Sequence, residues 1–409
     1  AILAIVGALS FFISPDDLIL HRKIFLEFML PAAYGGFLTA SMLEWTNYKG
    51  NLKPIATILA VLLLSGLVLL PFSPQTASFL VAAYWLALLL FCAWLFWLDR
   101  NTDNFTLLML LAAFMVCQTA YTMTDSLKLL RAQVHLNMAA VMFVSIRVSI
   151  LLGAEALKES TLKDPVFIPN VVYKNIAITF LLLHTAAELW LPAQTAAFTA
   201  FAVGFILLAK LRELHHHELL RKHYIRTYYF LQLFAAIGYL WIGINKLLDE
   251  PTADPLHMVT LGGILGSMMM IWLTAGLWHS GFTKLDYPKL CRLAVLCLFT
   301  AALSRACLMY VDELFFITIP AILIAIVSGT ESNIPTVPSN HPQNNNDKNT
   351  IKVESPRVFP INLGSTILPI IILIEITPSE TPKPVENPFN NRACKIIGIA
   401  ATIEPIFGI

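Results

Sequence analysis

The chain has 409 residues, of which 57% are hydrophobic and only 13% are charged. Soluble domains are about half apolar and roughly one quarter charged, so this chain is too poor in charge to cover a soluble surface of its size. The formal net charge of +1 provides no basic field that would attract nucleic acid. The six cysteines include no CxxC pair and fit neither a zinc ribbon nor a disulfide framework. The composition indicates a polytopic membrane protein.

A membrane-spanning helix needs about 20 mostly apolar residues, because lipid offers no hydrogen-bond partner to the backbone. The sequence predicts an all-α transmembrane bundle of about twelve such helices within residues 1–328. The predicted runs are residues 1–14, 24–45, 53–72, 75–98, 104–123, 134–152, 171–191, 194–210, 228–248, 256–278, 290–310 and 312–328. Residues 329–409 are rich in Asn and Pro, so we predict a disordered tail there.

Lys and Arg gather in the segments that follow the even-numbered runs, for example Arg212, Arg221 and Lys222. Such enrichment is typical of the cytoplasmic side of a membrane protein. We therefore expect the N-terminus on the cytoplasmic side. Arg22 and Lys23 are the exception, because they lie on the outer side, next to a histidine.

Four histidines from four different runs fall on the outer side of the predicted bundle. His21 precedes the second run, His135 and His257 open the sixth and the tenth, and His184 lies in the outer half of the seventh. Imidazole is a common ligand of metals and of haem, so this pattern predicts a metal or haem site between helices. A histidine at a helix end also commonly bonds to a carbonyl or to water, and the pattern leaves open which of the four are ligands.

Further polar residues lie inside the predicted spans, where they are costly and commonly functional. Glu188 follows His184 by one helical turn and is placed to accept the second ring N–H of that histidine. Arg147 and Arg305 would pair with haem propionates or with an internal carboxylate.

The tenth run contains two histidines, His257 and His279, which are 22 residues apart. In a helix this separation is about 33 Å, so the two cannot bind one ion. Either there are two sites at opposite faces of the membrane, or only one of the two residues is a ligand.

The segment LHMVTLGGILGSMMMIWLTAGLWHSG, from Leu256 to Gly281, resembles the signature helix of the NnrS family, in which a His, a Gly-rich turn and a second His recur at this separation. The resemblance covers about residues 15–328. Other matching positions are His21, Gly36 to Ala40, Trp45-Thr46, Arg147-Val148, Tyr239 and Trp241. The chain departs from the family at Lys23, where a second His is usual, and at Ile146, where Gly is usual.

NnrS-like proteins are haem- and copper-containing membrane proteins of the bacterial response to nitric oxide. The resemblance therefore implies haem and copper as cofactors, nitric oxide as a ligand and the bacterial inner membrane as the location. It makes His21, His257 and His279 the expected metal ligands. The alternative is a secondary transporter that uses intramembrane His, Glu and Arg residues. Whether the chain catalyses a reaction stays open at this point.

Overall fold

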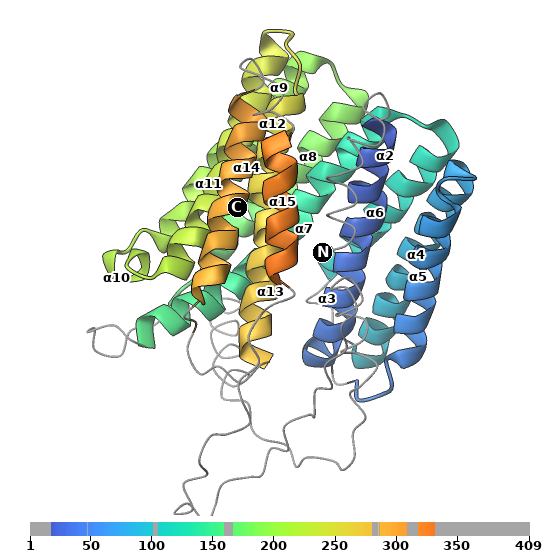
Figure 1. Ribbon diagram of the computed structural model, residues 1–409, viewed down its shortest axis with the longest axis horizontal. Coiled ribbons are helices and arrows are strands. Elements are labelled where there is room, and N and C mark those ends of the chain that lie inside the picture. Colours follow the sequence, from blue (N-terminus) through green and yellow to red (C-terminus); the bar gives the residue numbers. More distant parts are fainter. Residues whose placement is uncertain are drawn as a thin grey trace, which may run out of the picture. The chain divides into compact units, whose positions relative to one another are not determined.

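The computed structural model describes residues 18–46, 48–100, 105–158, 167–279, 285, 287–308 and 318–331, and within them every regular element is a helix (Figure 1). The elements are α2 (Leu18–Lys23), η1 (Ile24–Met29), α3 (Leu30–Trp45), α4 (Lys53–Leu69), α5 (Pro74–Asp99), α6 (Phe105–Thr124), α7 (Leu127–Lys158), α8 (Val171–Trp190), α9 (Ala193–Lys210), η2 (Leu211–Leu214), α10 (His217–Leu220), α11 (His223–Leu247), α12 (Ala253–His257), η3 (Met258–Leu265), α13 (Gly266–His279), α14 (Lys289–Cys307) and α15 (Ile319–Glu331).

A helix is present at each predicted run that falls within the described residues. Eight helical segments of this part of the chain are long and apolar enough to cross a membrane. The predicted number of about twelve spans is not confirmed, since α4, α8 and α15 are not among these eight segments and residues 1–14 lie outside the described chain. The predicted tail lies outside it too, except that α15 continues to Glu331, past the expected boundary at residue 328.

The outer surface of the helices is apolar, as expected of a protein in lipid. Phe72 is 82% exposed, and Trp97 and Trp190 are each 77% exposed. In water such side chains would be costly to expose, and as a group they would favour aggregation. The apolar surface and the length of the helices together identify a membrane protein.

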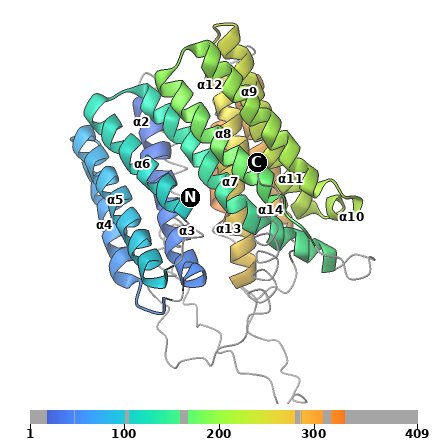
Figure 2. The ribbon, with the colours of Figure 1, turned by 180° about the vertical axis from the view of Figure 1, so that it is seen from behind.

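Helix α7 lies in the middle of the bundle (Figure 2). It has 32 residues, most of them buried, and contacts α6, α8, α11, η1 and η3. Neighbouring helices along the chain also pack in pairs, including α7 with α8 and α8 with α9. Consecutive elements are usually adjacent in space, and the pairing of α7 with α8 places residues of the same depth next to each other.

Two elements, η1 and η3, are π-helices, whose wider turns are frequent near functional sites. The η3 segment packs closely on α11 at Gly238. A Cβ atom added to Gly238 would lie 2.6 Å from Val259 Cγ2 and 3.1 Å from the carbonyl oxygen of Pro255. The missing side chain of Gly238 therefore lets η3 approach α11, right beside Tyr239.

Buried polar side chains form two clusters on opposite faces of α7. Gln133 and His135 are two residues apart, and successive helical residues are rotated by about 100°, so their side chains leave α7 in nearly opposite directions. Gln133 faces α6, where its amide donates to Gln118 Oε1 at 2.8 Å. His135 faces α8 and α11, where it contacts His184 and Tyr239.

The cluster on the Gln133 side contains a buried ion pair. Lys23 Nζ lies 3.0 Å from Glu27 Oε2 and 2.8 Å from the hydroxyl of Ser78, and Gln118 donates to the other oxygen of Glu27. The two charged side chains are only 7% and 0% exposed. Four helical elements, α2, η1, α5 and α6, are thus joined by one network of charge-assisted hydrogen bonds. We name these residues the lysine–glutamate cluster.

Candidate metal centre

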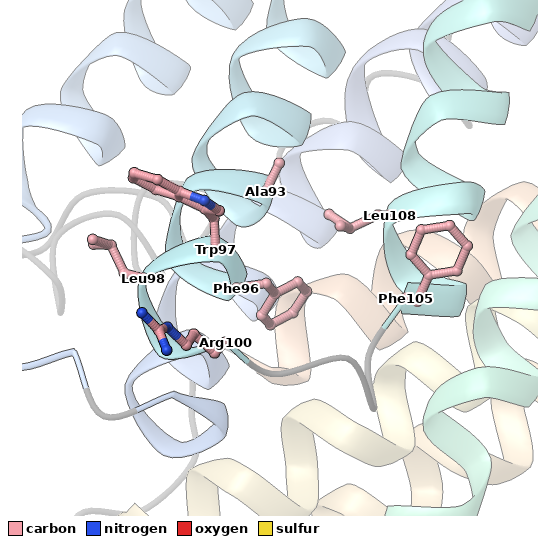
Figure 3. A pocket seen from close by; sticks show the side chains of 7 residues that line it. All are labelled: Ala93, Phe96, Trp97, Leu98, Arg100, Phe105 and Leu108. Carbon is pink, nitrogen blue, oxygen red and sulfur yellow. The ribbon is translucent and has the colours of Figure 1, made fainter.

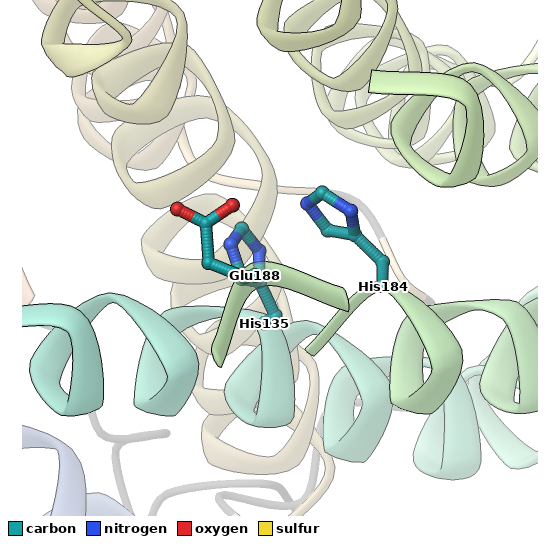
Figure 4. A group of neighbouring side chains, drawn as sticks. All are labelled: His135, His184 and Glu188. Atoms are coloured by element: carbon teal, nitrogen blue, oxygen red, sulfur yellow. The ribbon is translucent and has the colours of Figure 1, made fainter. Parts of the chain in front are cut away.

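His135 of α7 and His184 of α8 meet on the other face of α7, in the interior of the bundle (Figure 4). They are 2% and 0% exposed, and their ring centroids are 4.5 Å apart. Glu188 lies one turn after His184 on α8, and one ligand atom from each of the three residues lies within 4.8 Å of the others. The sequence placed both histidines on one side of the membrane, and the fold brings these two into contact.

The hydrogen bonds of His184 fix which of its ring nitrogens carries the proton. Thr199 donates its one hydroxyl hydrogen to the carbonyl oxygen of Ala196 at 2.9 Å. The same hydroxyl lies 2.9 Å from His184 Nδ1, and so it can only accept the Nδ1–H of the histidine. In the neutral ring Nε2 is then a bare acceptor, and it is buried without a hydrogen-bond partner.

A buried hydroxyl contacts the ring of His135 as well. Tyr239 of α11 is 0% exposed, and its hydroxyl lies 3.0 Å from His135 Nδ1. Tyr239 therefore engages one ring nitrogen of His135, and Nε2 is the other. Histidines that bind metals usually have the other ring nitrogen tied in this manner, because the tie fixes the orientation of the ring.

Glu188 has a different partner from the one that the sequence predicted. Its Oε2 atom lies 2.6 Å from Lys246 Nζ, in a pair whose side chains are 6% and 13% exposed. The expectation that Glu188 accepts the second N–H of His184 is wrong, because Thr199 of α9 takes that hydrogen. Thr199 lies on α9 and Lys246 on α11. Because neither residue is on α8, its contact with His184 or Glu188 cannot be read directly from the sequence.

The three residues fit a single transition-metal ion. Metal–nitrogen and metal–oxygen bonds are about 2.0–2.2 Å long, so ligand atoms around one ion lie within about 4.4 Å of one another, and small side-chain shifts would bring the three residues to this spacing. Two imidazoles and a carboxylate suit copper, zinc or iron. The unpartnered Nε2 of His184 supports a ligand at this place, since a buried acceptor without a partner costs about 1–3 kcal/mol.

The two cavities that flank α5 do not fit a haem. It would need a large cavity with a histidine in its wall. A cavity of about 600 Å³ lies at the ends of α5 and α6, and one of about 20 Å³ lies between α3, α4 and α5. Neither has a histidine in its wall.

The other predicted residues of the outer side form a separate group around His257. This residue ends α12, and its Nδ1 lies 2.7 Å from the carbonyl oxygen of Ala253. Arg305 and His21 are close enough to His257 to interact with it electrostatically. Arg305 also faces Asp254, with 3.7 Å between Nη1 and Oδ1, so Asp254 is an internal carboxylate of the kind predicted for this arginine.

Arg147 and His279 lie away from both histidine groups in the described contacts. The guanidinium of Arg147 stacks on Trp45 at 3.6 Å from the ring centroid and lies 5.8 Å from that of Phe143, so aromatic faces stabilise its charge. His279 ends α13, at the opposite end of the helical run that begins with α12. The side chain of His279 lies outside the described part of the structure.

Sequence reasoning did not find Thr199, Tyr239 and Lys246 as parts of the site. Tyr239 was noticed only as part of a family pattern. One signal was present, since each of these residues is a polar side chain in an apolar run at a depth close to that of His184. A comparison of depth in the membrane that included hydroxyl and ammonium groups, and not only histidines, would have found these three residues.

Comparison with known protein families matches residues 1–330 with NnrS, described as NnrS protein. A comparison with curated proteins gives no match, and a comparison with solved structures gives none either. The family match spans the helices described above to within the last residue of α15 and agrees with the resemblance of the α12 to α13 segment. The chain belongs to the NnrS family.

Proposed function

We propose that this protein binds a copper ion at His135, His184 and Glu188 and acts in the response to nitric oxide at the bacterial inner membrane. The observation that carries the proposal is the buried Nε2 of His184, an acceptor without a hydrogen-bond partner beside a second histidine and a carboxylate. Copper and nitric oxide are the metal and the ligand that the resemblance to NnrS-like proteins implies.

The residues around the site have distinct tasks in this proposal. A copper ion held by these three residues would keep an open coordination position, at which it would bind nitric oxide. Thr199 leaves Nε2 of His184 free for the metal, and Tyr239 contacts Nδ1 of His135 and so orients that ring. Lys246 balances the charge of Glu188 inside the bundle. The apolar surface of the helices gives a small apolar gas access from the lipid, in which it dissolves well.

Haem is the second cofactor that the family suggests, and we keep it as a separate proposal. Its expected histidine ligands are His21, His257 and His279. The two cavities described above have no histidine in their walls, so neither supplies an axial ligand for it. The same purified protein tests both cofactors, because haem has a Soret band and protein-bound Cu(II) has an electron paramagnetic resonance spectrum.

The decisive experiment is a metal and haem analysis of the purified full-length chain with two sets of variants. His135→Ala and His184→Ala remove the proposed copper ligands, and His21→Ala, His257→Ala and His279→Ala are the matched controls. We expect the first set to lose stoichiometric copper and the controls to retain it. Copper that is lost from the His21 or His257 variants and retained in the His184 variant would refute the site. Wild-type protein that binds no copper would refute the proposal as a whole.

A secondary transporter is the alternative function, and the lysine–glutamate cluster favours it. Buried charges in a membrane commonly line the path of an ion or a proton. Transport should then depend on Glu27, which does not belong to the proposed copper site. Substrate-dependent flux in proteoliposomes that is lost in Glu27→Gln but retained in His184→Ala would favour this alternative.

A further inference from the structure

A buried ion pair lies at the candidate metal centre. Lys246 Nζ of α11 is 2.6 Å from Oε2 of Glu188, the carboxylate that Figure 4 shows beside the ring of His135. The side chain of Lys246 is 13% exposed and that of Glu188 is 6% exposed. Neither of the two cavities described above, of which Figure 3 shows the larger, is lined by a residue of this centre. The charge of Lys246 therefore acts on the centre with little screening by water.

The ion pair leaves the carboxylate of Glu188 able to bind an ion. Among the described residues, Glu188 Oε2 is buried and accepts no well-formed hydrogen bond, although the ammonium of Lys246 lies 2.6 Å away. Nε2 of His184 is likewise buried without a hydrogen-bond partner. Two acceptor atoms of one small cluster thus have room for a further bond. The ammonium of Lys246 has no lone pair, so it adds charge to the centre but no ligand atom.

The charges of the described residues at the centre cancel before any ion binds. Histidines bind metals in their neutral form, Glu188 carries one negative charge and Lys246 carries one positive charge. Arg131 also acts electrostatically on His135, but Arg131 is exposed, so water weakens its effect. A monovalent ion therefore gives the buried centre a net charge of one unit, and a divalent ion gives it two.

The repulsion between Lys246 and the ion grows with the charge of the ion. Metal–oxygen bonds are about 2.2 Å long, so an ion on Oε2 of Glu188 would lie within about 5 Å of the ammonium. At this distance, with an effective dielectric constant of about 20, a second unit of charge on the ion weakens binding by about 100-fold or more. The ligand atoms alone do not make this distinction, because imidazole and carboxylate also suit Cu(II) and Zn(II).

We propose that Lys246 makes the centre selective for a monovalent ion, so that copper is held as Cu(I) while Cu(II) and Zn(II) are disfavoured. Lys246 makes no bond to the ion and acts through its charge alone. The inference rests on the copper site proposed above, and it adds the oxidation state of the ion and the residue that determines it.

The affinities of the purified full-length protein for Cu(I) and Zn(II) test the proposal, each measured by competition with a chelator and with Cu(I) kept under anaerobic conditions. Lys246→Met removes the charge, and we expect the affinity for Zn(II) relative to Cu(I) to rise about 100-fold over the wild type. The reduction potential of bound copper should fall by about 120 mV, since a tenfold change corresponds to 59 mV for one electron. A redox titration followed by the electron paramagnetic resonance signal of Cu(II) measures this potential. Both readouts compare two ions or two oxidation states at the same ligands, so partial loss of folded protein does not change them.

Two further variants separate the charge of Lys246 from its structural role. Lys246→Arg retains the charge and should retain the selectivity and the potential of the wild type. Lys246→Gln is a second neutral variant and should repeat the shift of Lys246→Met. Arg131→Gln is the matched control, because it removes an exposed cation that also acts on His135, and it should change the relative affinity less than about threefold.

The outcomes distinguish this inference from the copper site on which it rests. Unchanged selectivity in both neutral variants of Lys246 would overturn the inference and leave the copper site standing. A shift of the same size in Lys246→Arg or in Arg131→Gln would overturn it too, because side-chain shape or general surface charge would then set the preference. A wild type that binds no copper in either oxidation state would refute the proposed function itself, and the role of Lys246 would fall with it.

Discussion

The ion pair of the lysine–glutamate cluster gives a stability prediction that can be worked out from its geometry. Lys23→Met leaves the carboxylate of Glu27, which is 0% exposed, without its ammonium partner at 3.0 Å. Loss of one partner of a buried ion pair typically costs about 3–5 kcal/mol, whereas removal of both charges is often nearly neutral. The double variant Lys23→Met with Glu27→Gln loses mainly the 2.8 Å hydrogen bond to Ser78, which is worth about 1 kcal/mol.

The prediction is therefore that the double variant is more stable than either single variant. The free energy of unfolding can be measured by titration with sodium dodecyl sulfate in mixed micelles, followed by circular dichroism. Lys158→Met is the matched control, because Lys158 forms a 2.7 Å pair with Glu155 but is 58% exposed. It should cost at most about 1 kcal/mol. A double variant no more stable than Lys23→Met would refute the reasoning, since the two charges would then be uncoupled.

Three further predictions concern the copper site and its support. Thr199→Val removes the acceptor that orients His184, and copper affinity should fall about 10- to 100-fold, as measured by competition with a chelator. Tyr239→Phe should weaken copper binding in the same assay with little change in helix content, because it removes only the hydroxyl beside His135. Gly238→Ala places a Cβ atom 2.6 Å from Val259 and should lower the free energy of unfolding by about 1–3 kcal/mol; an unchanged unfolding curve would mean that η3 can move away freely.

The positions of the helices could be predicted from the sequence because an apolar run in lipid is stable only as a helix. A run of about 20 apolar residues must satisfy its backbone internally, and a helix does so. The same argument placed His135 and His184 at one end of the bundle, and the structure has them 4.5 Å apart. The two residues come from consecutive helices that pack against each other, and this pairing brings them together.

Other features could not be predicted because they depend on the rotation of helices about their own axes. Which side of a helix faces which neighbour decides that His184 meets Thr199 and that Glu188 meets Lys246. The π-helical turns of η1 and η3 depend on backbone hydrogen bonding and leave no clear mark in the composition. The topology and the roles of His21, His257 and His279 stay predictions, and the cofactor variants described above test these roles.

The length of α7 makes the candidate centre sensitive to the thickness of the bilayer. Its 32 residues extend over about 48 Å, while the hydrocarbon core is only about 30 Å thick. Tilting alone would require an angle of about 50°, which exceeds the range of up to about 40° seen for membrane helices. Part of α7 must therefore extend beyond the hydrocarbon, and a thinner or thicker membrane changes its tilt. Because Gln133 and His135 lie on opposite faces of this one helix, a change in tilt raises one polar cluster relative to the other.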